Sequence, residues 1–429
     1  MKGSDMSDDK QNKPAFFYGW LVLAACVLIG MTAAAQLTYG IYVKELIAEF
    51  HWNRTLTSSI SSVHYFVYSL AAVLAGTIAD RYRPRPLILV SAVLLGGGLL
   101  LCGLARNVWQ MYLFFGIVAA LGTSCCYCVP SSIVQRWFIE KRSVALGISM
   151  CGISIGSFVI SLLVGYLIPH YGWRVGFFAE GAFLFSIMIL ASIFMAGNPE
   201  EKGLLPYGAE KIQTASLITN LNQNDVWTFK SLIANKYFIG CFANQFFTCI
   251  SLIIMYTHFV ANAEDMGIPK LAAAGALGMV GVISAAGRFQ AGYLCERIGY
   301  KKGLILSCGL CLVAFLYLIF VRNLLMLYVF VIFYSLGYGG KAMALPGLTG
   351  EVFGTNSLGK ILGLIAIAFG TGGFIGSVLG GWIFDQTDSY CLAFIAGAFF
   401  YLMAILSVAH IRPNPQPAAH VPAKQPKRI

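Results

Sequence analysis

Two basic residues lie inside long apolar stretches of the sequence. Arg288 occurs in GVISAAGRFQAGYLCERIG (281–299), eight residues before Glu296, and Lys341 occurs in YSLGYGGKAMALPG (334–347). At helical rise, Arg288 lies about 12 Å and Lys341 about 15 Å from the nearest charged helix end. An arginine presents a planar fork that matches both oxygens of a carboxylate, and it stays protonated when buried. We therefore interpret Arg288 as a carboxylate anchor and Lys341 as a second source of positive potential.

Acidic residues do not occur deep in the apolar stretches of the sequence. The nearest is Glu180, about seven residues into its stretch. A charge at the centre of a bilayer costs about 2.5–3.5 kcal/mol on insertion scales, so a buried cation needs a compensating partner. An anionic substrate would supply that partner. Two structural alternatives stay open, because Arg288 could extend to the membrane surface and Lys341 could cap backbone carbonyls.

Polar side chains at helical spacing predict the rest of a binding site. Ser284 precedes Arg288 by one helical turn, and Tyr338 shares a helix face with Lys341. Further candidates from other stretches are Gln36, His64, Tyr127 and Asn244. Each of them could instead form an ordinary hydrogen bond between helices.

The composition indicates an integral membrane protein. Of 429 residues, 58% are hydrophobic and only 11% are charged. The 12 cysteines lie mostly inside apolar runs and are expected to pack as small apolar residues, without a disulfide framework or a metal site. The sequence has no phosphate-binding loop, nucleophile elbow or acidic pair. We therefore expect no enzyme activity, no cofactor and no metal.

Twelve segments of the sequence are long and apolar enough to cross a membrane. A polar stretch, 198–234, divides them into two sets of six. We therefore predict an all-α membrane protein with a tail (1–14), an N-terminal bundle (15–197), the polar linker, a C-terminal bundle (235–411) and a second tail (412–429). The predicted spans are approximately 17–46, 55–79, 87–105, 108–135, 143–168, 173–197, 235–261, 269–294, 303–321, 325–350, 359–384 and 389–411.

Basic residues are distributed unequally between the two sides of this predicted bundle. The side that carries both tails has 21 Lys and Arg, and the other side has six. This bias predicts that both termini are cytoplasmic. The net charge of +11 is thus a topology signal and not a nucleic-acid surface.

An internal repeat supports the division into two halves. GTIADRYRPRP (76–86) and GYLCERIGYKK (292–302) share the pattern G-x-x-x-[DE]-R, 216 residues apart, each between the second and third span of its half. Acidic and basic residues in such loops can hold one conformation closed. The predicted members of this conformational clasp are Asp80, Arg81, Arg142, Glu296 and Arg297.

These loops resemble the loop signature of the major facilitator superfamily. Within that superfamily the chain looks like the monocarboxylate transporter family and its oxalate–formate exchanger relatives, over roughly residues 16–411. The matching segments are YVKELIAEFHW (42–52), WFIEKRSVALGISMCG (137–152) and GTGGFIGSVLGGWIFDQTDSY (370–390). The resemblance implies a carboxylate-binding arginine in the eighth helix, which is Arg288 here.

The resulting expectation is an alternating-access carrier of small monocarboxylates of the lactate or pyruvate class. The resemblance implies proton symport, and the candidate groups that take up the proton are Lys341 and His64. The expected partners are the substrate, a proton and the lipid bilayer, with no nucleic acid. We expect a monomer in the plasma membrane, or in the inner membrane of a bacterium. One alternative is an antiporter of dicarboxylate against monocarboxylate, and a lesser one is a receptor that senses organic acids.

Overall fold

The computed structural model describes residues 17–81, 83–209, 229–353 and 358–411, and the elements of these residues are helices. One isolated bridge joins Phe138 to Tyr207. The helices are α1 (Gly19–Thr32), α2 (Ala35–Thr38), η1 (Tyr39–Ile41), α3 (Val43–Phe50), α4 (Arg54–Arg81), α5 (Pro84–Gly103), α6 (Val108–Met111), η2 (Tyr112–Ala119), α7 (Ala120–Thr123), α8 (Cys125–Trp137), α9 (Arg142–Tyr171), α10 (Trp173–Phe194), η3 (Pro199–Lys202), α11 (Phe229–Ile233), α12 (Lys236–Asp265), α13 (Lys270–Ile298), α14 (Tyr300–Leu318), α15 (Leu324–Phe353), α16 (Leu358–Thr387) and α17 (Cys391–Ala409).

Twelve spans are long and apolar enough to cross a membrane within the described residues, which confirms the predicted number. Ten of them are single helices. The first span, Gly19–Ile41, is interrupted where α1 gives way to α2 and η1. The fourth span, Val108–Trp137, passes through η2, a π-helical stretch. Short π-helical stretches inside helices are frequently found at functional sites.

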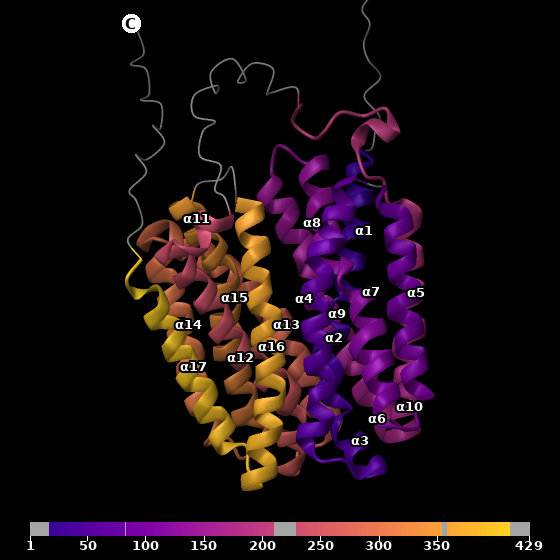
Figure 1. The fold of residues 1–429 in the computed structure, drawn as a ribbon, viewed down its shortest axis with the longest axis vertical. Coiled ribbons are helices and arrows are strands. Elements are labelled where there is room, and N and C mark those ends of the chain that lie inside the picture. Colours follow the sequence, from indigo (N-terminus) through magenta and orange to yellow (C-terminus); the bar gives the residue numbers. More distant parts are fainter. Residues whose placement is uncertain (1–16, 82, 210–228, 354–357, 412–429) are drawn as a thin grey trace, which may run out of the picture.

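The helices run between two ends of an elongated bundle (Figure 1). We call the end that carries Gly19 and Ala409 the terminal end; it lies at the top of Figure 1. The opposite end carries α3 and the turn between α12 and α13, and we call it the far end.

Helices α1–α10 form an N-terminal set, and α12–α17 form a C-terminal set (Figure 1). The two sets contact each other mainly through α4 with α16 and through α9 with α13. The contacts are close at glycines: a Cβ at Gly278 would lie 2.9 Å from Cα of Phe158, and one at Gly381 would lie 2.7 Å from the carbonyl oxygen of Arg54. Small residues let two helix backbones approach in this way.

These contacts are not continued at two glycines nearer the terminal end. Gly147 precedes Ser154 by seven residues, two turns on the same face of α9, and Gly363 has the same relation to Gly370 on α16. Ser154 and Gly370 both touch the opposite set, whereas a Cβ at Gly147 or Gly363 would meet no described atom within 4 Å. Among the described residues the two sets therefore touch from the far end to the middle, and these two glycines nearer the terminal end do not contribute to the contact.

Candidate functional site

The two buried cations predicted from the sequence lie on neighbouring helices. Arg288 is on α13 and Lys341 is on α15, and the two helix backbones touch at this level because glycines face the contact. A Cβ at Gly287 would lie 2.7 Å from the carbonyl oxygen of Leu336, and one at Gly339 would lie 3.0 Å from the backbone nitrogen of Arg288. Because the helices touch here, Arg288 and Lys341 lie at about the same depth along the helical bundle.

Lys341 is held by a neutral side chain. Its side chain is buried, and Nζ donates a hydrogen bond to Oε1 of Gln245 on α12 at 2.6 Å. The Nε2 of Gln245 lies 3.2 Å from Sγ of Cys249, so the amide is fixed on both sides. An amide satisfies one hydrogen bond but does not neutralise an ammonium charge. The neighbouring Asn244 was among the site residues predicted from the sequence, whereas Gln245 was not.

Arg288 is half-buried and forms no ion pair or hydrogen bond with the residues that the structure describes. Tyr256 on α12 lies within electrostatic range of it. The backbone of Tyr256 in turn meets Gly40 of η1, so this part of α12 is packed against the N-terminal set. Arg288 is thus a cation near the contact between the two sets, and the described residues supply it with no carboxylate.

The other predicted site residues of the C-terminal set are mostly engaged with neighbouring helices. Asn244 is buried, donates from Nδ2 to the carbonyl of Ala404 at 2.9 Å, and leaves its own buried Oδ1 without a described partner. Ser284 donates to the carbonyl of Gly281 at 2.7 Å. The ring of Tyr338 lies parallel to that of Tyr334, with centroids 6.3 Å apart. Their contact with a substrate stays a prediction.

The N-terminal set supplies two predicted residues with free polar atoms. Gln36 is buried, and its Oε1 has no partner among the described residues. His64 donates from Nδ1 to the carbonyl oxygen of Phe115 at 2.9 Å, and its buried Nε2 has no described partner. Phe115 belongs to η2, so His64 faces the π-helical stretch. The side chain of Tyr127 lies outside the described residues.

The clasp predicted at the terminal end stays a prediction. Glu296 and Arg297 are exposed at the end of α13, and the Arg297 guanidinium lies 4.3 Å from the ring centre of Tyr293. The side chains of the other predicted members, Asp80, Arg81 and Arg142, lie outside the described residues.

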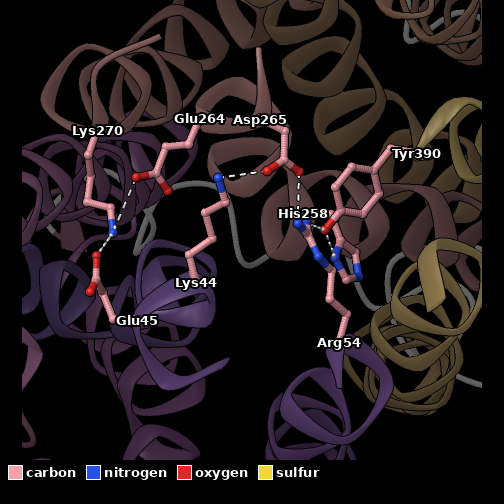
Figure 2. A network of polar contacts seen from close by, with 8 residues as sticks. All are labelled: Lys44, Glu45, Arg54, His258, Glu264, Asp265, Lys270 and Tyr390. Atoms are coloured by element: carbon pink, nitrogen blue, oxygen red, sulfur yellow. Dashed lines mark hydrogen bonds and ion pairs between the residues drawn. The ribbon is translucent and has the colours of Figure 1, made fainter. Parts of the chain in front are cut away.

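A network of ion pairs joins the two sets at the far end (Figure 2). One carboxylate oxygen of Asp265 on α12 forms an ion pair with Lys44 Nζ at 2.7 Å. Its other oxygen forms an ion pair with Arg54 Nη2 at 2.9 Å. Lys270 Nζ lies 2.6 Å from Glu45 and 3.4 Å from Glu264. We call these six residues the far-end clasp.

Further contacts support the far-end clasp around Arg54 (Figure 2). Its guanidinium donates to the hydroxyl of Tyr390, which also lies 3.3 Å from Nδ1 of His258. The carboxylate of Asp385 on α16 accepts from the backbone nitrogens of Arg54 at 3.0 Å and Thr55 at 2.8 Å, and so caps the start of α4. Sequence reasoning used these basic residues only as topology signals.

Two carboxylates of the N-terminal set hold its own helices. Glu180 of α10 is buried and accepts from Thr38 at 2.9 Å and Tyr42 at 2.7 Å, on either side of η1. Glu49 of α3 accepts from Nε1 of Trp173 at 2.6 Å and from Arg174. The hydrogen bonds from Trp173 and Arg174, together with the positive charge of Arg174, lower the pKa of Glu49.

Comparison with known proteins identifies the family. The family model of the Major Facilitator Superfamily matches residues 20–365 and 262–428. The chain belongs to the major facilitator superfamily. It is therefore a multi-pass membrane protein that transports small molecules, and it is not an enzyme.

The related sequences confirm the resemblance to the monocarboxylate transporter family. Monocarboxylate transporter 12-B of Danio rerio is 24% identical over 92% of this chain and 88% of its own. Monocarboxylate transporter 4 of Rattus norvegicus is 26% identical over 89% of this chain and 80% of its own.

Solved structures share the fold. A bacterial homolog of the human lysosomal transporter Spinster, in an inward-facing and occupied conformation, has a TM-score of 0.69 at 15% identity, over 91% of this chain and 96% of its own. The unoccupied form has a TM-score of 0.67 at 17% identity, over 92% of this chain and 94% of its own.

Proposed function

We propose that this protein carries small monocarboxylates of the lactate or pyruvate class across a membrane, with Arg288 as the residue that binds the carboxylate. The observation that carries the proposal is a guanidinium within a membrane span that pairs with no described residue. A carboxylate substrate supplies both the opposite charge and a geometry that accepts two parallel hydrogen bonds. The names of the related proteins support the same substrate class.

Lys341 supplies a second positive charge at the same depth. Its hydrogen bond to Gln245 keeps the ammonium in place without neutralising it. An incoming anion therefore gains attraction from two cations, while only Arg288 offers the bidentate geometry. Gln245 adds an amide that positions Lys341 between substrate-binding events.

Alternating access follows from the arrangement of the two sets. The far-end clasp holds the sets together at one end, and Gly147 and Gly363 nearer the other end do not contribute to the described contact between the sets. We place the terminal end in the cytoplasm because of its excess of Lys and Arg, and we infer that substrate reaches the site from this end in the present conformation. Opening of the far-end clasp and closure of the terminal end then expose the site to the other side.

Proton symport completes the proposal. Lys341 and His64 are the candidate groups that take up the proton, and the proton can also enter with the undissociated acid. The test uses purified protein in liposomes that contain no internal substrate. An imposed pH gradient, acidic outside, should drive accumulation of labelled lactate, and a protonophore should abolish it. Protein-free liposomes and Arg288→Ala liposomes are the controls.

An antiporter of dicarboxylate against monocarboxylate is the second candidate. Two cations on touching helices favour it, because a dianion would neutralise both. The same liposomes separate the two functions. Gradient-driven uptake into vesicles without internal substrate excludes obligatory exchange, whereas uptake that occurs only when oxalate or another dicarboxylate is loaded inside overturns the symport proposal.

A further inference from the structure

Three spans of the C-terminal set meet at an open basic pocket at the terminal end. Helix α12 begins there at Lys236, α14 begins at Tyr300, and α17 ends at Ala409. The pocket has a volume of about 540 Å³ and is open to solvent, since Lys236, Ala409 and His410 in its lining are exposed. Its lining residues are Lys236, Tyr237, Lys301, Ala409 and His410. None of these five carries a carboxylate.

The lining side chains are held in place by one another. Lys301 Nζ donates to the carbonyl oxygen of Ala409 at 2.6 Å. The rings of Tyr237 and His410 stack with centroids 6.3 Å apart, and Lys236 Nζ lies 5.3 Å from the centre of the Tyr237 ring. Nε2 of His410 lies 3.2 Å from the carbonyl oxygen of Lys236. The pocket therefore presents two ammonium groups and an imidazole from a connected arrangement.

The position of the pocket points to a negatively charged ligand of the membrane surface. All three helices are membrane spans that begin or end at the pocket, so it lies where hydrocarbon gives way to lipid headgroups. The helices α12 and α14 also contribute the positive ends of their dipoles at this level. Lys301 covers the carbonyl end of α17, which would otherwise repel an anion.

We propose that this pocket binds the phosphate group of an anionic phospholipid headgroup. Phosphate accepts several hydrogen bonds from ammonium and imidazole donors, and basic pockets between spans are known recognition sites for acidic headgroups. Inorganic phosphate shares this chemistry, but it lacks the acyl chains that would hold a lipid at the depth of the three spans. The site is separate from Arg288 and does not depend on the transported substrate.

The experiment measures thermal unfolding of the delipidated full-length protein in detergent. Addition of dioleoyl phosphatidylglycerol should raise the Tm by about 2 °C relative to dioleoyl phosphatidylcholine. The double variant Lys236→Gln/Lys301→Gln should lose most of this rise. The matched control is Lys302→Gln, which removes an exposed lysine next to Lys301 that does not line the pocket, and it should keep the rise.

A second readout covers the case in which the double variant unfolds. Native mass spectrometry of the single variant His410→Gln should show fewer retained phosphatidylglycerol molecules than wild type. If inorganic phosphate raises the Tm as much as phosphatidylglycerol does, the pocket binds phosphate, but its ligand is a soluble anion and not a lipid. The proposal is overturned if phosphatidylglycerol leaves the wild-type Tm unchanged, if the double variant responds like wild type, or if Lys302→Gln loses as much as the double variant.

Discussion

Substitution of Asp265 by asparagine tests whether the far-end clasp sets the conformation of the protein. Asp265→Asn keeps the shape of the side chain but removes the charge that pairs with both Lys44 and Arg54. The side chain of Asp265 is 30% exposed, that of Lys44 is 29% and that of Arg54 is 12%. The Lys44 pair is thus partly exposed at both ends, whereas in the Arg54 pair the guanidinium is largely shielded and the carboxylate is partly exposed.

The magnitude follows from these exposures. A solvent-exposed pair contributes about 0.2–1 kcal/mol, and a hydrogen bond to a charged group contributes about 1.5–3 kcal/mol when it is shielded. Arg54 keeps its contact with Tyr390, so the net loss should be about 1–3 kcal/mol. This corresponds to a shift of about 5- to 150-fold toward the form that is open at the far end. From a population of about 1%, that form would rise to between about 5% and 60%.

The assay measures the distance between spin labels on the two sets by pulsed electron paramagnetic resonance. Labels at the exposed positions Ala48 on α3 and Gln386 on α16, attached through a genetically encoded keto amino acid, leave the 12 native cysteines unchanged. The longer-distance population should grow in Asp265→Asn. The matched control Asp388→Asn removes an exposed acid of the same end that takes no part in the described ion pairs. An unchanged distance distribution in Asp265→Asn would refute the reasoning.

Three further predictions concern single residues. Lys341→Gln should raise the KM for lactate by about 10- to 100-fold, because a charge-assisted contact with the substrate is lost. The pH dependence of the KM should also become weaker. Unchanged kinetics would mean that Lys341 has only a structural role. Gly40→Ala should reduce uptake, because the added methyl overlaps with the backbone of α12 at a cost of about 1–3 kcal/mol, whereas Gly147→Ala, which meets no described atom, should transport normally. The lowered pKa of Glu49 means that its contribution to stability is present above its ordinary pKa of 4.5 and is lost as the pH falls through the folded-state value. The Tm should accordingly fall on acidification, and Glu49→Gln should show a smaller fall; an equal fall in the variant would contradict this role.

The spans and their number could be predicted because a bilayer imposes one requirement on every segment that crosses it. Length and apolar composition suffice for that prediction, and the twelve spans agree with it. Interruptions of the helix within a span do not change the length or the apolar composition of the segment. The change from α1 to η1 and the π-helical η2 keep the same apolar composition, so neither could be read from the sequence.

The candidate site was predictable only where a residue type is unusual for its environment. Arg288 and Lys341 are conspicuous because charges inside a span are rare. Gln245, which holds Lys341, is not conspicuous, since a single amide in an apolar helix more often bonds to a neighbouring helix. The far-end clasp was missed because the three ion pairs that join the two sets connect residues about 210–225 positions apart, at helix ends whose proximity depends on the fold.

The central claim is that Arg288 binds the carboxylate of the substrate. The most direct test compares uptake of labelled lactate by wild type, Arg288→Ala and Arg288→Lys in liposomes, after size-exclusion chromatography has shown that all three are folded. We predict that Arg288→Ala abolishes uptake and that Arg288→Lys is severely impaired, because lysine keeps the charge but lacks the planar fork. Near-normal uptake by Arg288→Ala would contradict the account.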